Sequence, residues 1–141
     1  MTSPMTEEAH KRVPGVTWMT MVRTLRTTDA RRYFASNVTL DASVLDRTSH
    51  GIKAVRAYFV AASSLYDSLK FTHETVSGAR TFLEWEGRAF GKAVGGITVL
   101  VRSKSGRIAK IRLYLRPSAA VVQFTAALHR LSAKSNNGRS H

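Results

Sequence analysis

Residues 81–117 constrain the fold of this chain more than any other stretch, because three apolar-rich runs follow one another with short glycine-bearing turns between them. In the first run Leu83 and Trp85 share one face of an extended chain, and Glu84 lies on the other. The last run repeats this alternation over 109–116. A period of two is typical of strands with one buried and one wet face. The stretch therefore predicts an antiparallel meander whose apolar face other segments must cover.

Helices are the expected cover for that face. Residues 52–66 place apolar side chains at intervals of three and four, which is the spacing of an amphipathic helix. A short helix is expected over 5–12 and should end before Pro14, and the next one can start with Thr17 as its N-cap. Each of these segments can lay an apolar side on the sheet.

The other segments complete an α+β order. Residues 29–36 predict a short helix, and 37–45 and 68–76 predict strands. The glycine-rich residues 91–96 read as a hairpin connection, and 118–133 predict a last amphipathic helix. The expected order is helix, helix, strand, helix, four strands and helix, with helices on one face of a mixed or antiparallel sheet.

The length of 141 residues fits one domain, which buries about 68–70% of its unfolded surface. We divide the chain into an N-terminal extension (1–16), the domain (17–131) and a disordered basic tail (132–141). The absence of cysteine excludes disulfides, thiolate nucleophiles and cysteine-based zinc sites. Neither a membrane-spanning run nor a signal peptide is visible, so we expect a cytoplasmic protein. No glycine-rich phosphate loop or metal-ligand cluster is visible, so no cofactor is expected.

Positive charge dominates the composition, with 22 Lys plus Arg against 9 Asp plus Glu, a formal net charge of +13. Attraction to nucleic acid, acidic lipid or an anionic ligand would explain it, and so would solubility alone. The basic residues are scattered and form no Lys- or Arg-rich block. Specific nucleic-acid binding is therefore not expected, and weak salt-sensitive binding is.

Four segments carry a resemblance to a known superfamily. They are YFASNVTLDA (33–42), HGIKAVRAYF (50–59), SLKFTHE (68–74) and the meander with its flanks (86–121). Together they resemble the nuclear transport factor 2-like superfamily, which includes SnoaL-like polyketide cyclases and ketosteroid isomerases. The resemblance implies a cone-shaped α+β fold with a strongly curved, mixed but mostly antiparallel sheet and helices on its concave face. It also implies a pocket for a small, largely apolar molecule, and often a dimer.

Strand parity and the resemblance together name the expected pocket residues. These are Trp18, Met21, Val22, Phe59, Leu83, Trp85, Thr98, Leu100, Ile111 and Leu113. Arg102 has the parity of Thr98 and could hold a carboxylate or a phosphate at the pocket mouth, or simply lie in solvent. The expected ligand is a small apolar or partly anionic organic molecule. Trp18 and Trp85 could cradle a planar ligand or fill the core.

The acid and base groups of the superfamily's enzymes are largely missing. Thr98 stands where the resemblance places the carboxylic acid of ketosteroid isomerases, and Ile111 and Leu113 stand where cyclases often have His and Asp. Asp41, near the end of the first strand, is the best remaining carboxylate for a general base. A shift of one residue would turn Ala42 inward instead.

His73 on the second strand is the candidate partner of Asp41. For both residues the ordinary alternative is a surface position, where Asp41 would meet one of the many arginines. The sequence thus predicts a small-molecule-binding protein whose catalytic status is open. The alternatives are an isomerase, dehydratase or cyclase with a pocket acid or base, and a protein-interaction module.

A homodimer is the expected assembly. The apolar residues Ile97, Val99 and Val101 fall on the outer face of the sheet, where the resemblance and the need to cover apolar surface both favour a second subunit.

Overall fold

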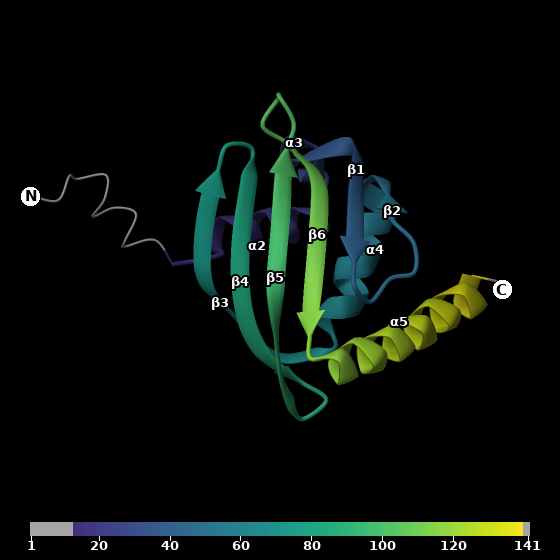
Figure 1. Cartoon of the computed structure of the whole chain (residues 1–141). Helices are drawn as coiled ribbons and strands as arrows, with labels where there is room; N and C mark the ends of the chain where they lie inside the picture. The colour runs from purple at the N-terminus through teal and green to yellow at the C-terminus, as the bar shows by residue number, and fades with distance from the viewer. Residues whose placement is uncertain (1–12, 140–141) are drawn as a thin grey trace, which may run out of the picture.

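A strongly bent six-stranded sheet organises residues 13–139, the part of the chain that the computed structural model describes (Figure 1). Its strands lie in the order β2-β1-β6-β5-β4-β3. Strands β3 to β6 form an antiparallel meander, and β1 runs parallel to β6. The sheet is therefore mixed but mostly antiparallel, as expected. The helix expected over 5–12 lies outside the described residues.

The elements follow the predicted order, with one addition. The strands are β1 (Phe34–Ala42), β2 (Ser49–His50), β3 (Tyr66–Ser77), β4 (Arg80–Ala89), β5 (Lys92–Arg102) and β6 (Ile108–Arg116). The helices are α2 (Val16–Thr24), α3 (Ala30–Tyr33), α4 (Gly51–Ser63) and α5 (Ser118–Arg139). The addition is the two-residue strand β2, which pairs with β1 just before α4. None of the helices within 13–139 is long and apolar enough to cross a membrane.

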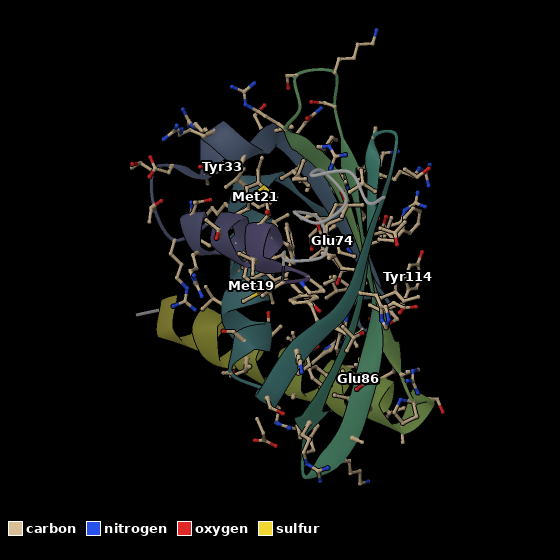
Figure 2. The ribbon with its side chains drawn as sticks, turned by 90° about the vertical axis from the view of Figure 1, so that its left-hand side faces the viewer. Met19, Met21, Tyr33, Glu74, Glu86 and Tyr114 are labelled. Carbon is tan, nitrogen blue, oxygen red and sulfur yellow. The ribbon has the colours of Figure 1, made fainter. Side chains whose placement is uncertain are left out.

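The two faces of the sheet differ as the alternation predicts. On β4 the side chains of Leu83 and Trp85 are buried, whereas Glu84 is exposed. Leu83 pairs with Thr98 of β5, which in turn pairs with Leu113 of β6, so the inward row continues across three strands. Figure 2 shows the outer side of the sheet turned away from α2. The helices thus cover the concave face.

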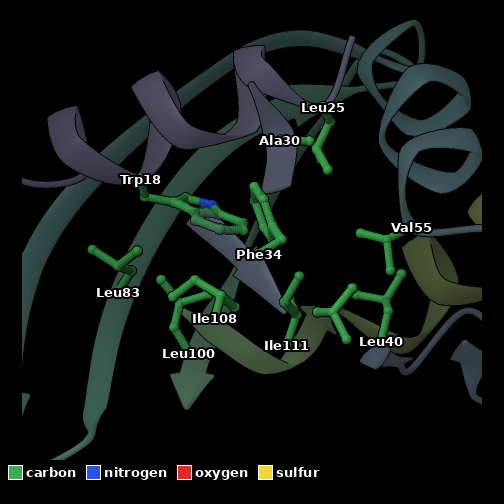
Figure 3. Close-up of a cluster of buried hydrophobic side chains, with 11 residues drawn as sticks. Trp18, Leu25, Ala30, Phe34, Leu40, Val55, Leu83, Leu100, Ile108 and Ile111 are labelled. Atoms are coloured by element: carbon green, nitrogen blue, oxygen red, sulfur yellow. The ribbon is translucent and has the colours of Figure 1, made fainter. Parts of the chain in front are cut away.

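One hydrophobic core joins α2, α3 and α4 to the sheet (Figure 3). The Trp18 ring of α2 meets Phe34 edge-on at a centroid distance of 6.0 Å. Beneath them lie Leu83, Leu100 and Ile111, each at most 1% exposed. Burying side chains of this size stabilises the fold by about 1.5–3 kcal/mol each.

A second core lies where α5 crosses the lower end of the sheet (Figure 1). Phe124 and Leu128 are buried there against Trp85, Ala89 and Val94. The spacing of Phe124 and Leu128 is that of one helical face, so this part of α5 follows the predicted stripe. The helix continues to Arg139, into the segment 132–141 for which the sequence predicts disorder. Extending a formed helix avoids the cost of nucleating one.

The first strand begins earlier than the sequence predicts. The helix expected over 29–36 ends at Tyr33, and Phe34 already has extended backbone angles. Phe34 pairs with Ile108 of β6, so sheet pairing wins over continuation of the helix. The strand expected over 37–45 consequently runs from Phe34 to Ala42.

The start of α2 is also set by a tertiary contact. The N-cap is Gly15 with a φ of 79°, not Thr17. A Cβ at Gly15 would collide with the Phe71 ring, and the Gly15 N–H donates to Glu74 Oε1 of β3 at 2.8 Å. Glycine therefore lets the helix start directly on the sheet.

The hairpin expected at 91–96 is shorter than predicted. Its turn is formed by Phe90 and Gly91, and β5 begins at Lys92. Gly95 and Gly96 lie inside β5, opposite Glu86 and Trp85. Glycine marks a close approach within a strand here, not a turn.

Gly96→Ala should destabilise the fold, because the new Cβ would collide with the Tyr114 carbonyl oxygen and lie 2.6 Å from the Trp85 ring. We expect a loss of about 1–3 kcal/mol in the free energy of unfolding, measured by urea denaturation. Gly95→Ala is the matched control, since its nearest contact would be the Trp85 carbonyl oxygen at 3.2 Å. Equal stability of the two variants would contradict the close approach of Trp85 and the Tyr114 carbonyl oxygen to Gly96.

Candidate functional site

A cavity of about 290 Å³ lies between the helices and the concave face of the sheet. Helices α2, α4 and α5 and all strands except β2 contribute to its wall. Aromatic side chains dominate: Trp18, Tyr58, Phe59, Tyr66, Phe71, Trp85 and Phe124. Its volume is close to the lower end of ordinary ligand sites, about 300–1,000 Å³.

The wall of the cavity carries no charged side chain among the described residues. Its polar side chains are hydroxyl groups, notably those of Ser43, Ser63 and Thr98, and two tyrosines, Tyr58 and Tyr66. Hydroxyl groups can orient a polar atom of a ligand by hydrogen bonds. Within the described part of the chain, the wall has no carboxylate and no imidazole, which are the usual general bases.

Tyr58 and Tyr66 are the titratable groups of this wall with strongly buried rings, whereas Tyr114, which also borders the cavity, is 51% exposed. Burial raises the pKa of the Tyr66 phenol from 10.0 to about 12. Burial raises the pKa of Tyr58 still further, with an added repulsive effect from Tyr66. Both phenols therefore stay protonated at neutral pH and act as hydrogen-bond donors.

Neither tyrosine hydroxyl hydrogen-bonds to another group in the part of the chain that the structure describes. Every fully buried side-chain nitrogen or oxygen in that part has a hydrogen-bond partner. Because the two tyrosine hydroxyls have no partner, they are not fully buried and stay accessible. Two unpartnered donors on residues that line an apolar cavity can serve an acceptor atom of a ligand.

Ring packing fixes the positions of these aromatic residues. Tyr66 packs edge-on to Trp85 at 5.7 Å between centroids and lies 5.0 Å from the Phe124 ring. On the other side, Phe59 packs edge-on to Trp18 at 5.7 Å and to Tyr58 at 5.3 Å. Such contacts restrict the rings and preform the cavity wall.

Six of the predicted pocket residues line this cavity: Trp18, Val22, Phe59, Trp85, Thr98 and Leu113. Leu83, Leu100 and Ile111 have the predicted inward direction but are packed into the core beside Trp18. Met21 also packs against that core, one helix position away from the cavity residue Val22. Strand parity predicts which face a residue is on, but not whether a void lies above it.

Arg102 does not line the cavity. Its Nη1 donates to Thr81 Oγ1 at 2.7 Å and its Nη2 donates to the Gly78 carbonyl oxygen at 3.1 Å. The side chain ties the end of β5 to the β3–β4 turn, which satisfies the guanidinium within the sheet.

Asp41 and His73 lie outside the cavity, so the structure does not bring the two candidate catalytic residues together. Asp41 is exposed and accepts a hydrogen bond from the Thr48 hydroxyl, whereas the next residue, Ala42, lines the cavity. His73 is exposed too, and its Nδ1 lies 2.9 Å from Glu84 Oε2 on the outer face. Within the described residues, no cluster of three or more His, Asp or Glu could hold a metal ion.

Sequence reasoning missed several residues of the cavity wall, above all Tyr58, Tyr66 and Phe71. Tyr58 follows Val55 by three residues and is next to Phe59, so its helical spacing carried a signal. Tyr66 fits the helical stripe equally well, but α4 ends at Ser63 and the residue starts β3. Phe71 pairs with Trp85 across the sheet, which sequence pattern alone does not specify.

Comparison with known proteins identifies structures of similar fold. No protein-family model and no curated protein matches the sequence significantly. Among solved structures, a steroid delta-isomerase from Pseudomonas aeruginosa has a TM-score of 0.75 at 15% identity, over 86% of this chain and 90% of that one. A protein with a cystatin-like fold from Silicibacter pomeroyi has a TM-score of 0.70 at 16% identity, over 82% and 84%.

A putative isomerase of the SnoaL-like family from Agrobacterium tumefaciens also matches, with a TM-score of 0.51 at 18% identity over 71% of this chain and 94% of that one. At these identities the likeness concerns the fold. The chain has the cone-shaped α+β fold of nuclear transport factor 2-like proteins.

Stability should fall as the pH rises from about 10 to about 12, because the unfolded chain releases the Tyr66 proton first. The raised pKa stabilises the folded state below the unfolded pKa of 10.0, and this contribution is lost as the pH passes through the folded value. Urea denaturation between pH 9 and 11.5 should show a steeper decline for the wild type than for Tyr66→Phe, by up to about 1.4 kcal/mol per pH unit. Thr98→Val is the control, because it removes a hydroxyl that does not titrate from the same wall, and it should keep the slope of the wild type.

Proposed function

We propose that this protein binds a small, largely apolar organic molecule that carries a hydrogen-bond acceptor, such as a carbonyl group. The observation that carries the proposal is the uncharged, aromatic cavity whose wall includes two protonated tyrosines, Tyr58 and Tyr66. Apolar surface supplies the affinity, and a few polar groups fix the orientation of the ligand.

The hydroxyl groups give this cavity its selectivity. A carbonyl oxygen within reach of Tyr58 or Tyr66 would accept a hydrogen bond in a setting of low dielectric, where such bonds are strong. A ligand with a negative charge would lose its hydration in the cavity, and none of the described residues of the wall offers a cation to compensate this cost. Neutral ligands are therefore favoured over the partly anionic ones that Arg102 suggested.

Binding without acid–base catalysis is favoured over isomerisation. Proteins of similar fold include a steroid delta-isomerase and a putative SnoaL-like isomerase. Proton abstraction next to a carbonyl requires a base within hydrogen-bond reach of the substrate. Asp41 and His73 are on the outside of the sheet. Tyr58 and Tyr66 have raised pKa values and stay protonated at neutral pH, so they cannot accept a proton there.

Tyr66→Phe and Tyr58→Phe should each weaken the binding of a carbonyl ligand while sparing a hydrocarbon of the same shape. The test pair is 2-acetylnaphthalene and 2-ethylnaphthalene, with dissociation constants from isothermal titration calorimetry. Loss of one hydrogen bond should weaken ketone binding about 2–12-fold, in one variant or shared between the two. Tyr33→Phe, whose ring packs on the other core, is the matched control.

Equal effects of these variants on the ketone and the hydrocarbon would contradict a role for the hydroxyls. If the wild type turns over an enone and Asp41→Asn does not, binding without catalysis would be contradicted. Asp41 would then act as the base that the wall of the cavity does not provide.

We also propose that the outer face of the sheet pairs with a second copy of this chain. Ile97 of β5 and Tyr114 of β6 are 40% and 51% exposed there. Ile97 lies between the glutamates of β4 and the basic residues of β6. Glu86 and Arg116 face each other across Gly95 of β5. A two-fold axis along β5 would place Glu86 of one copy over Arg116 of the other, so the surface complements itself.

Ile97→Lys should convert the dimer to a monomer at about 50 µM, measured by light scattering, because it buries a charge at the centre of the interface. Val122→Lys on α5 is the control for an added charge, since Val122 is 68% exposed and far from this face in the fold. Glu86→Lys should weaken the dimer and Glu86→Lys with Arg116→Glu should restore it. A wild-type protein that is monomeric at this concentration would contradict the pairing.

A further inference from the structure

A second hollow is lined by α3, the β5–β6 turn and their neighbours. Figure 1 shows α3 and the β5–β6 turn at the end of the sheet opposite α5. The hollow is an open groove of about 1330 Å³ and shares no lining residue with the aromatic cavity. Its wall comes from the α2–α3 loop, α3, the start of β1, α4 and the β5–β6 turn. We refer to it as the basic groove.

Five cationic side chains converge on the basic groove: Arg26, Arg31, Lys53, Arg56 and Arg107. Among residues 13–139 no carboxylate belongs to its lining, and Asp29, the acid nearest in sequence, is not part of the wall. Among the described residues both ion pairs with carboxylates use histidine, so none of the five cations has an acidic partner there. Gathering like charges costs stability, and an anion in the groove would offset that cost.

Two of the arginines are held in place by the backbone. Arg56 Nε donates to the Leu25 carbonyl oxygen, and Arg107 Nε donates to the Arg31 carbonyl oxygen at 2.8 Å. Each guanidinium is thus fixed through Nε, and its terminal Nη1 and Nη2 remain to form a fork. Such a fork matches two oxygens of one phosphate group.

The rest of the wall indicates an organic ligand. Thr27, Thr28 and Ser36 bring hydroxyl groups to the groove, and the half-buried Ile52 brings apolar surface. The aliphatic stems of the lysine and the arginines add to that apolar surface. A bare inorganic anion would use the cations and leave the apolar part unoccupied. The cations come from four separate segments around one hollow, which suits a compact anion better than a long strand.

We propose that the basic groove binds an organic polyphosphate, such as a nucleoside triphosphate. The phosphate groups would lie among the five cations and the organic part would lie against the apolar side chains. This site is independent of the proposed function of the aromatic cavity, and it gives part of the net charge of +13 a specific role.

The test is binding of a fluorescent adenosine triphosphate analogue in magnesium-free buffer. The salt concentration is about 0.15 M, at which charges are screened as at physiological ionic strength. Arg31→Gln with Lys53→Gln removes two exposed cations of the groove. The control is Lys70→Gln with Lys92→Gln, which changes the net charge equally at exposed positions outside the groove. We expect saturable binding that weakens at least 10-fold in the groove variant and less than 2-fold in the control. Unlabelled adenosine triphosphate should compete better than tripolyphosphate.

Several results would overturn the proposal. One is an absence of saturable binding by the wild type, and another is equal weakening in both double variants, which would mean a bulk charge effect. Better competition by tripolyphosphate would remove the organic part from recognition. Displacement of the analogue by a 30-nucleotide single strand, at a lower nucleotide concentration than adenosine triphosphate requires, would assign the groove to nucleic acid instead. Circular dichroism checks that both variants are folded.

Discussion

The aromatic cavity depends on the close approach of Trp85 to Gly96. The two residues pair across β4 and β5, and a side chain at Gly96 would collide with the Trp85 ring and the Tyr114 carbonyl oxygen. The missing side chain lets the sheet bend while the indole lies on its concave face. Tyr66 and Phe124 then pack around the indole. On a flat sheet the helices would pack directly against the strands and leave no cavity between them. The positions of the residues in the cavity wall therefore depend on the bend.

The distribution of charge follows from the same geometry. Inward positions of the bent sheet are closed off from water by α2, α4 and α5, and an ionised group there would lose its hydration. The cavity accordingly has hydroxyl groups as its polar side chains, and burial keeps Tyr58 and Tyr66 protonated. The excess of basic residues lies on the outside, where water and counterions solvate them. At the end near α3 they converge on one groove. The fold thus separates a neutral site from a cationic one.

Asp41 shows how far the candidate site could be predicted from the sequence. The strand, its parity and the alternative Ala42 were all visible, yet the choice between the two neighbours needed the register of β1 on β6. In the structure Asp41 pairs with Arg112 and Ala42 pairs with Leu113, which faces inward. A shift of this register by one residue would exchange the directions of the two side chains, and the register depends on pairing with β6, which is far away in the sequence. Leu83 and Leu100 could be placed on the inner face by strand parity. Whether they lie in the core or line the cavity depends on the helix that packs above them, which the strand pattern does not specify.

The sequence by itself determined the meander, the inward and outward faces of β4 and β6, helix α4 and the buried stripe of α5, because apolar periodicity records which side of an element meets water. It also determined the absence of cysteine chemistry and the excess of positive charge. Tertiary structure alone decided the end of α3 at Tyr33, the strand role of Gly95 and Gly96, the outward direction of Asp41 and the convergence of distant arginines on one groove. Each of these depends on contacts between residues far apart in the chain, and such contacts leave no period in the sequence.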